Sequence, residues 1–276
     1  MSVLRARIGL TLTALLAAVT LPLGAAWHGG ALGRTAEAQP ATSVGRVGTA
    51  PAVTLVRDVA PVAAPRIPER AAADDVVAEF PGIDSKVLRL ALAAHERAID
   101  RGLVERPDLL TVIDYSLPST AKRLWVLDLA NGKVLFHELV AHGKNTGDNF
   151  ARAFSNRDKS LQTSLGLFRT AGTYTGHNGY SMKLQGLEPG FNDEAESRSV
   201  VMHGASYVSE QFAAEHGRIG RSWGCPALSL AAAPKVIDTI KGGSLVFSYY
   251  PNTDWLSQSR FVGTALASTL GVAAGR

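Results

Sequence analysis

Cysteine is nearly absent from this sequence: Cys225 is the only one among 276 residues. No disulfide can therefore form within the chain. A lone cysteine is either an inert, buried side chain or a reactive thiol, and in an exported protein it is a flag for the second. The neighbours Gly224 and Pro226 favour a turn over the interior of a helix or strand, which favours the reactive alternative.

The patterns of a metal site or a nucleic-acid site are also missing. The seven histidines are scattered, without the spacing of metal ligands. His137 and His142 lie on a predicted strand and at its end, and their odd separation turns them to opposite faces. His95 is expected on the solvated face of a helix. The net charge of +4 is too small to indicate a nucleic-acid partner. We therefore expect no metal site and no nucleic-acid partner.

Long apolar runs are confined to the two ends of the chain. Arg5 and Arg7 precede an apolar run over 8–23 that is followed by small residues, which is typical of a secretory signal peptide. We predict a signal peptide over 1–26, with an uncleaved membrane anchor as the alternative. Either way, the rest of the chain is expected in the periplasm or cell envelope. The second run, over 261–274, is too short and too interrupted by glycine to span a membrane.

Residues 27–75 are rich in Ala, Pro, Gly, Thr and Val without any period. Such a composition cannot bury a core and predicts a disordered linker. The remainder divides into a helical extension over 76–107, a main domain over 108–252 and a C-terminal tail over 253–276.

The main domain combines few helices with many short strands. Asp84 or Ser85 can cap a helix that ends near Gly102. Asn131-Gly132 between two apolar segments predicts a hairpin. Further strands are predicted over 110–115, 163–168, 182–184, 198–203 and 244–250, a helix over 230–240, and loop over most of 172–190. No predicted helix separates the strands between Thr111 and His203, so the domain is mainly β and is not a doubly wound parallel sheet.

The segment 201–228 concentrates the residue types that acyl transfer needs. It contains Cys225 and, at the end of a predicted strand, His203. A thiol with a pKa of about 8.5 is only a few per cent ionised at neutral pH, so an imidazole must take its proton or stabilise its anion. A main-chain carbonyl beside Gly204 could orient the imidazole. We therefore predict that Cys225 and His203 form a nucleophile–base pair.

Groups near this pair could complete a site. The backbone N–H groups of Trp223, Gly224 and Cys225 are candidates for an oxyanion hole, and Arg221 could bind a substrate carboxylate. Aromatic side chains that could line a substrate groove, unless they simply pack, are Tyr180, Tyr207 and Trp223.

The strings His203-Gly204 and Ser222-x-Gly224-Cys225 resemble the signature of the L,D-transpeptidase (YkuD-like) catalytic domain. The longer strings Met-His-Gly-Ala-Ser-Tyr-Val and Gly-Arg-Ser-Trp-Gly-Cys-Pro-Ala are similar to its murein L,D-transpeptidase branch. The resemblance covers roughly residues 110–250. It implies a β-sandwich or barrel with an N-terminal helix and one packed C-terminal helix. The family pattern places an arginine two positions after the cysteine, where this chain has Ala227; Arg221 or Arg198 could take that role.

By this resemblance Cys225 is the nucleophile, His203 is the base and acid, Gly204 supplies the orienting carbonyl, and Ser222 lines the site. The implied reaction is thiolate attack on the carbonyl that follows the diamino acid of a peptidoglycan stem peptide. The terminal D-amino acid leaves and the acyl group passes to an acceptor amine, without any cofactor. Two alternatives stay open: a carboxypeptidase or endopeptidase that hydrolyses the same acyl-enzyme, and an exported binding protein without catalysis.

Overall fold

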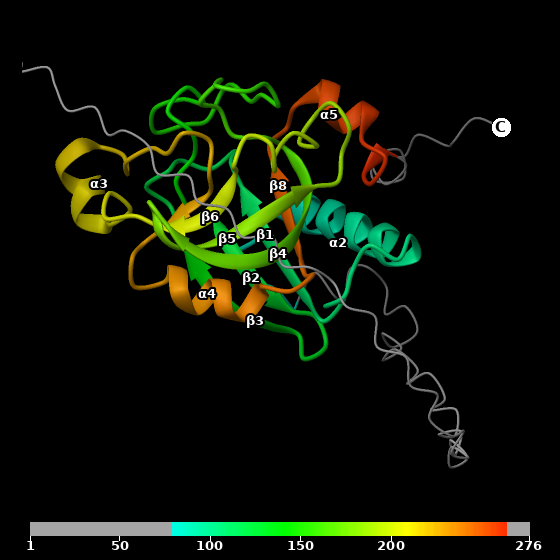
Figure 1. The fold of residues 1–276 in the computed structure, drawn as a ribbon. Helices are drawn as coiled ribbons and strands as arrows, with labels where there is room; N and C mark the ends of the chain where they lie inside the picture. The colour runs from blue at the N-terminus through cyan, green and yellow to red at the C-terminus, as the bar shows by residue number, and fades with distance from the viewer. Residues whose placement is uncertain (1–78, 264–276) are drawn as a thin grey trace, which may run out of the picture. The chain divides into compact units, whose positions relative to one another are not determined.

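The computed structural model describes residues 79–263. The predicted signal peptide and linker lie outside these residues, as does most of the C-terminal apolar run. The described chain forms, in order (Figure 1), α2 (Ser85–Asp100), β1 (Leu109–Asp114), β2 (Leu124–Asp128), β3 (Lys133–Glu138), β4 (Gly166–Gly176), β5 (Gly179–Gly186), β6 (Val201–Gly204), α3 (Glu210–His216), β7 (Ala227–Leu228), α4 (Ala233–Ile240), β8 (Leu245–Tyr249) and α5 (Thr253–Gln258).

All eight strands belong to one sheet in the order β3-β2-β1-β8-β4-β5-β6-β7. The pairs β1–β8 and β6–β7 are parallel, and the others are antiparallel. The chain that follows β3 returns to the opposite edge, where the Ala141 N–H donates to the Ala227 carbonyl at 2.8 Å. This contact rolls the sheet into a nearly closed barrel, so the prediction of a mainly β domain is confirmed.

The structure contains one hairpin that the sequence predicted and one in a segment that the sequence predicted to be mostly loop. The β2–β3 hairpin is confirmed, and Gly132 takes the positive φ (61°) that its turn requires. The prediction of loop over most of 172–190 is wrong, because β4 and β5 form a long hairpin that spans it. The glycines that recur there have low strand propensity, but pairing of the hairpin with β8 and β6 on either side supplies hydrogen bonds that the local sequence does not indicate.

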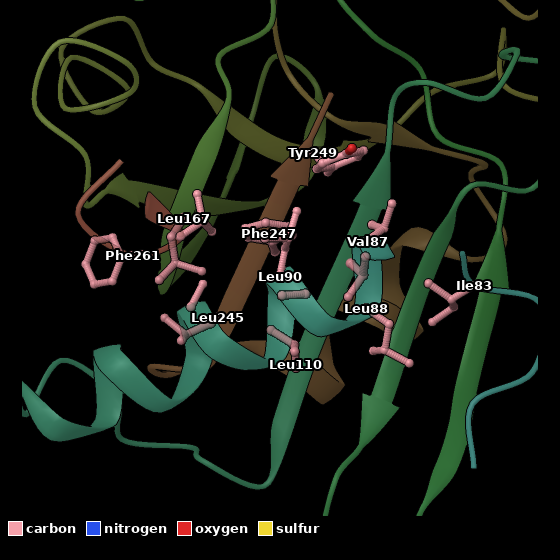
Figure 2. Packing of buried hydrophobic residues seen from close by; sticks show 14 of the residues in the cluster. Ile83, Val87, Leu88, Leu90, Leu110, Leu167, Leu245, Phe247, Tyr249 and Phe261 are labelled. Carbon is pink, nitrogen blue, oxygen red and sulfur yellow. The ribbon is translucent and has the colours of Figure 1, made fainter. Parts of the chain in front are cut away.

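Helix α2 begins at Asp84, whose carboxylate accepts the N–H groups of Lys86 and Val87 at 2.9 and 3.1 Å. Its apolar face packs across β1 and β8, and Figure 2 shows Leu90 of the helix among Leu110, Leu245 and Phe247 of these strands. The same core takes in α5 and the residues just after it. The segments that the sequence suggested as an extension and a tail thus share a core with the sheet.

His95 lies on the buried face of α2 and is 1% exposed. The prediction of a solvated position was therefore wrong, because this turn of the helix packs against the protein rather than facing water. Burial lowers the pKa of His95 to about 4, so the ring is neutral at pH 7.

Helix α4 packs on the other face of the sheet, where Val236, Ile237 and Ile240 join a second core (Figure 1). Met182 of β5 and Met202 of β6 belong to this core. Since neighbouring strand residues point to opposite faces, the residues beside these methionines face away from α4. The candidate site described below lies on this face, which points away from α4. None of the helices within residues 79–263 has both the length and the apolarity to cross a membrane.

Candidate active site

His203 lies on β6, and Cys225 lies in the bend just before the parallel neighbouring strand β7. His203 of β6 pairs with Ala227 of β7, and Cys225 precedes Ala227 by two residues, just as Val201 precedes His203. The Val201 N–H donates to Cys225 Sγ at 3.5 Å, so the thiol lies beside the backbone of β6 two residues before His203. Val201 and His203 are two positions apart on β6 and share the face that points away from α4.

The Cys225 thiol is held by backbone groups. It accepts the Val201 N–H and donates to the Ser199 carbonyl at 3.8 Å. Among the described residues the structure has no hydrogen bond between Sγ and the His203 ring. Burial raises the pKa of Cys225, an effect that the Val201 N–H and the charge of Arg198 partly offset. The Cys225 thiol is therefore protonated at neutral pH.

The His203 imidazole is 4% exposed and is oriented by its neighbour. Its Nδ1 lies 3.0 Å from the Gly204 carbonyl oxygen. A carbonyl only accepts, so Nδ1 carries the proton and Nε2 has a free lone pair. Burial lowers the pKa of His203, with this hydrogen bond acting in the other direction. The ring is thus a neutral base at pH 7, and the structure contains the His203–Gly204 contact that the sequence predicted.

The turn before Cys225 is held by Ser222. The Gly224 N–H donates to Ser222 Oγ at 3.1 Å, and Ser222 Oγ donates to the Cys225 carbonyl at 2.6 Å. Gly224 has φ = 132°, a conformation that other residues rarely adopt. The predicted oxyanion donor at Gly224 is therefore engaged inside the turn, which leaves the N–H groups of Trp223 and Cys225 as candidates. Ser222 thus positions Cys225 through the backbone.

A second loop braces this turn from outside. The Lys144 N–H donates to the Ser222 carbonyl at 2.7 Å. Thr163 Oγ1 accepts the Gly143 N–H at 2.9 Å and lies 3.3 Å from the Gly224 carbonyl. The sequence analysis singled out none of Gly143, Lys144 and Thr163, so these positioning residues were missed. Their importance comes from contacts between segments about 60 to 80 positions apart, for which the sequence holds no local signal.

A family model described as the L,D-transpeptidase catalytic domain matches residues 79–249. The chain belongs to the L,D-transpeptidase catalytic domain family. This confirms the resemblance seen in the cysteine and histidine motifs. The match begins before α2, in agreement with the core that this helix shares with the sheet.

Several solved structures are similar to this L,D-transpeptidase domain. An L,D-transpeptidase from Mycobacterium smegmatis is 16% identical, with 52% of this chain and 59% of that chain covered and a TM-score of 0.33. An L,D-transpeptidase from Stackebrandtia nassauensis is 16% identical, with 60% and 67% covered and a TM-score of 0.32. The helical cell shape determining protein Pgp2 from Campylobacter jejuni is 13% identical, with 52% and 48% covered and a TM-score of 0.34. No curated protein matches the chain.

The two arginines proposed for substrate binding both form hydrogen bonds with other residues of the L,D-transpeptidase domain. Arg221 Nη1 lies 2.7 Å from Asp148 Oδ1 and 3.1 Å from the Gly147 carbonyl. Arg198 donates to the Gln162 carbonyl at 2.7 Å, to the Ser155 carbonyl at 2.8 Å, and to two serine hydroxyls. A substrate carboxylate would have to displace these partners. Both arginines therefore hold loops in place around the site.

The three aromatic candidates have different positions. Tyr180 is on the wrong face: its hydroxyl donates to Asp238 of α4 at 2.7 Å, so the prediction that it lines the groove is wrong. Tyr207 is half-buried, and its pKa is raised to about 12 by burial and then by the charge of a Cys225 thiolate. Trp223, two residues before Cys225, is 80% exposed. Tyr207 and Trp223 thus remain candidates beside the thiol.

Within residues 79–263, no three His, Cys, Asp or Glu side chains come together as a metal ion would require.

Proposed function

We propose that this chain is a cysteine L,D-transpeptidase that acts on peptidoglycan stem peptides. The observation that carries the proposal is the contact of the Cys225 thiol with the Val201 N–H, two residues before His203 on β6, next to the pairing of β6 with β7. The Nδ1 contact to Gly204 leaves His203 Nε2 as the proton acceptor. Membership of the L,D-transpeptidase family supports peptidoglycan as the substrate.

The reaction starts from a neutral pair. As the donor binds, His203 Nε2 takes the thiol proton, and Sγ bonds to the carbonyl carbon that follows the diamino acid. The backbone N–H groups of Trp223 and Cys225 are the donors that would stabilise the resulting oxyanion. When the C–N bond breaks, the imidazolium gives its proton to the departing amine of the terminal D-amino acid, and a thioester remains. An acceptor amine then attacks the thioester, His203 takes the amine proton, and that proton returns to sulfur as the thiol leaves.

Hydrolysis uses the same thioester with water as the acceptor, so product analysis is the way to separate the two activities. The purified chain is incubated with a tetrapeptide donor, with and without an acceptor stem peptide, and the products are measured by mass spectrometry. We expect the wild-type protein to release the terminal D-amino acid. We expect a cross-linked product to form only when the acceptor is present. Equal release without a cross-link would assign the chain as a carboxypeptidase instead.

Variants of Cys225 test whether the site is catalytic at all. Cys225→Ala and Cys225→Ser are expected to abolish turnover and the donor-derived mass on the intact protein, while the thermal unfolding midpoint stays close to that of the wild type. His203→Ala is expected to lower the rate by about 100-fold or more, because the base is lost. Full activity in a folded Cys225→Ala variant would exclude this mechanism, and an inactive wild-type chain that still binds the peptide would support the binding-protein alternative.

We further propose that residues 1–26 export the chain, because its substrate lies outside the cytoplasmic membrane. Their basic start and apolar run support this proposal. Sequencing of the N-terminus of the protein recovered from the cell envelope would distinguish a cleaved signal peptide from a retained anchor.

A further inference from the structure

Lys183 is a cation on the face of the sheet that carries the His203 imidazole. On β5, Met182 and Leu184 are buried in the core that contains α4, so Lys183 between them points to the other face. It pairs directly with Val201, and Ser181 pairs with His203. Lys183 thus lies on the same face as the His203 imidazole and directly beside Val201.

Lys183 is also near the thiol. Val201, its partner across the strands, donates its N–H to Cys225 Sγ at 3.5 Å. Two strand spacings, about 10 Å, separate the Lys183 backbone from that of Cys225. The flexible four-carbon stem of a lysine can carry its ammonium group over much of this distance. The ammonium can therefore reach a group on a peptide whose carbonyl carbon is in contact with Sγ.

No group in the described part of the chain, residues 79–263, neutralises Lys183. Its side chain is exposed and makes no hydrogen bond or ion pair within residues 79–263. Strands β5, β6 and β7 contain no aspartate or glutamate that could compete for it. By contrast, Arg198 and Arg221 are occupied by loop carbonyls, serine hydroxyls and Asp148. Of these three cations, Lys183 is the one available to a ligand.

We propose that Lys183 binds a carboxylate of the donor stem peptide and so selects donors that carry this charge. The proposal rests on the function proposed above, because it takes the ligand of this face to be a stem peptide. Two carboxylates of the donor fit this chemistry: that of the terminal D-amino acid, and a side-chain or α-carboxylate within the stem. Both would form a charge-assisted hydrogen bond with an ammonium group.

The test combines kinetics with binding. The wild type, Lys183→Ala and Lys183→Arg are each assayed with three donors. One donor has all its carboxylates free, one has only the terminal carboxylate amidated, and one has only the internal carboxylates amidated. Lys183→Ala is expected to lower kcat/KM for the free donor roughly tenfold, mainly through KM, and Lys183→Arg to restore most of it. One amidated donor should give the same kcat/KM with the wild type and with Lys183→Ala. The carboxylate that is amidated in that donor is the one that Lys183 binds. Lys133→Ala, an exposed lysine at the start of β3, controls for a general charge effect and is expected to match the wild type.

Donor affinity is measured separately by calorimetry in the Cys225→Ala background, with and without Lys183→Ala, so that this inference and the proposed function can fail independently. Weaker binding in the Lys183→Ala variant supports the inference even if the wild type turns over no donor, an outcome that would overturn the proposed function alone. Equal affinity and equal kcat/KM in both variants would overturn the role of Lys183 while leaving transpeptidation intact. An equal loss on every donor, including the amidated ones, or no donor binding at all, would also overturn it.

Discussion

Gly143 and Gly224 approach so closely that a Cβ atom built on Gly143 would lie 3.0 Å from Gly224 Cα. The same Cβ would lie 2.4 Å from the Leu161 carbonyl oxygen. The turn that carries Cys225 thus contacts a loop more than 80 positions earlier in the chain, with no room for a side chain between them.

Gly143→Ala should therefore disturb the site. We expect a loss of about 2 kcal/mol in the free energy of unfolding, because backbone atoms must move, and a fall in kcat of at least tenfold. Gly172→Ala is the matched control, since a Cβ there meets nothing within 4 Å. Denaturant unfolding and donor turnover measure both variants. Wild-type turnover in Gly143→Ala would show that this contact does not position the nucleophile.

The pH dependence of kcat/KM should show that the Cys225 thiol and the His203 imidazole are both neutral before the donor reacts. Burial holds the pKa of His203 below its usual 6.5 and raises the pKa of Cys225 above its usual range. Activity requires a neutral imidazole, so kcat/KM should fall only below pH 6.5, by about tenfold per pH unit once His203 is protonated. It should be flat from pH 7 to 9. A maximum that needs protonated His203 would instead indicate a thiolate–imidazolium pair.

His142 should make the fold sensitive to acid. Arg123, which is fully buried, donates to His142 Nδ1 at 2.8 Å, so this nitrogen cannot be protonated while the contact lasts. Burial and then the charge of Arg123 lower the pKa of His142 to about 4 from 6.5. The unfolded chain takes up a proton below pH 6.5 and the folded chain does not until about pH 4, so stability is lost as pH falls through this window.

Replacement by a neutral acceptor isolates this effect. Between pH 7 and 5, the free energy of unfolding of His142→Gln should decrease by about 2 kcal/mol less than that of the wild type. Urea unfolding at the two pH values measures the difference. The comparison between the variants cancels the contributions of His95 and of the buried carboxyl groups. Equal decreases in both proteins would show that His142 is protonated in the folded state.

Arg198 should act on stability and kcat rather than on substrate affinity. Its guanidinium holds the loop that contains Gln162 and, beside it, Thr163. Arg198→Ala should lower the free energy of unfolding by about 2 kcal/mol and lower kcat, with the KM of the donor little changed. Arg157→Ala, an exposed arginine of the same loop, is the control. A rise in KM alone would return Arg198 to the role of a substrate ligand.

Local signals predicted much of the fold and the central pair of the site. A capping aspartate at position 84 and helical spacing of apolar residues specify α2, and Asn131-Gly132 specifies a hairpin. Cys225 and His203 stand out because few residue types can perform acyl transfer. Each of these inferences depends on residues close in sequence, whose geometry the backbone itself constrains.

Only the tertiary structure determined which residues each long polar side chain contacts. Arg221 was a free cation in the sequence and is ion-paired with Asp148 in the fold. Tyr180 and Lys183 are three positions apart, yet one contacts α4 and the other lies on the face that carries the His203 imidazole. A charged or aromatic side chain has the same chemistry on either face of a strand. Its role therefore depends on the sheet alignment and on loops far away in the chain, and these exist only once the barrel has closed.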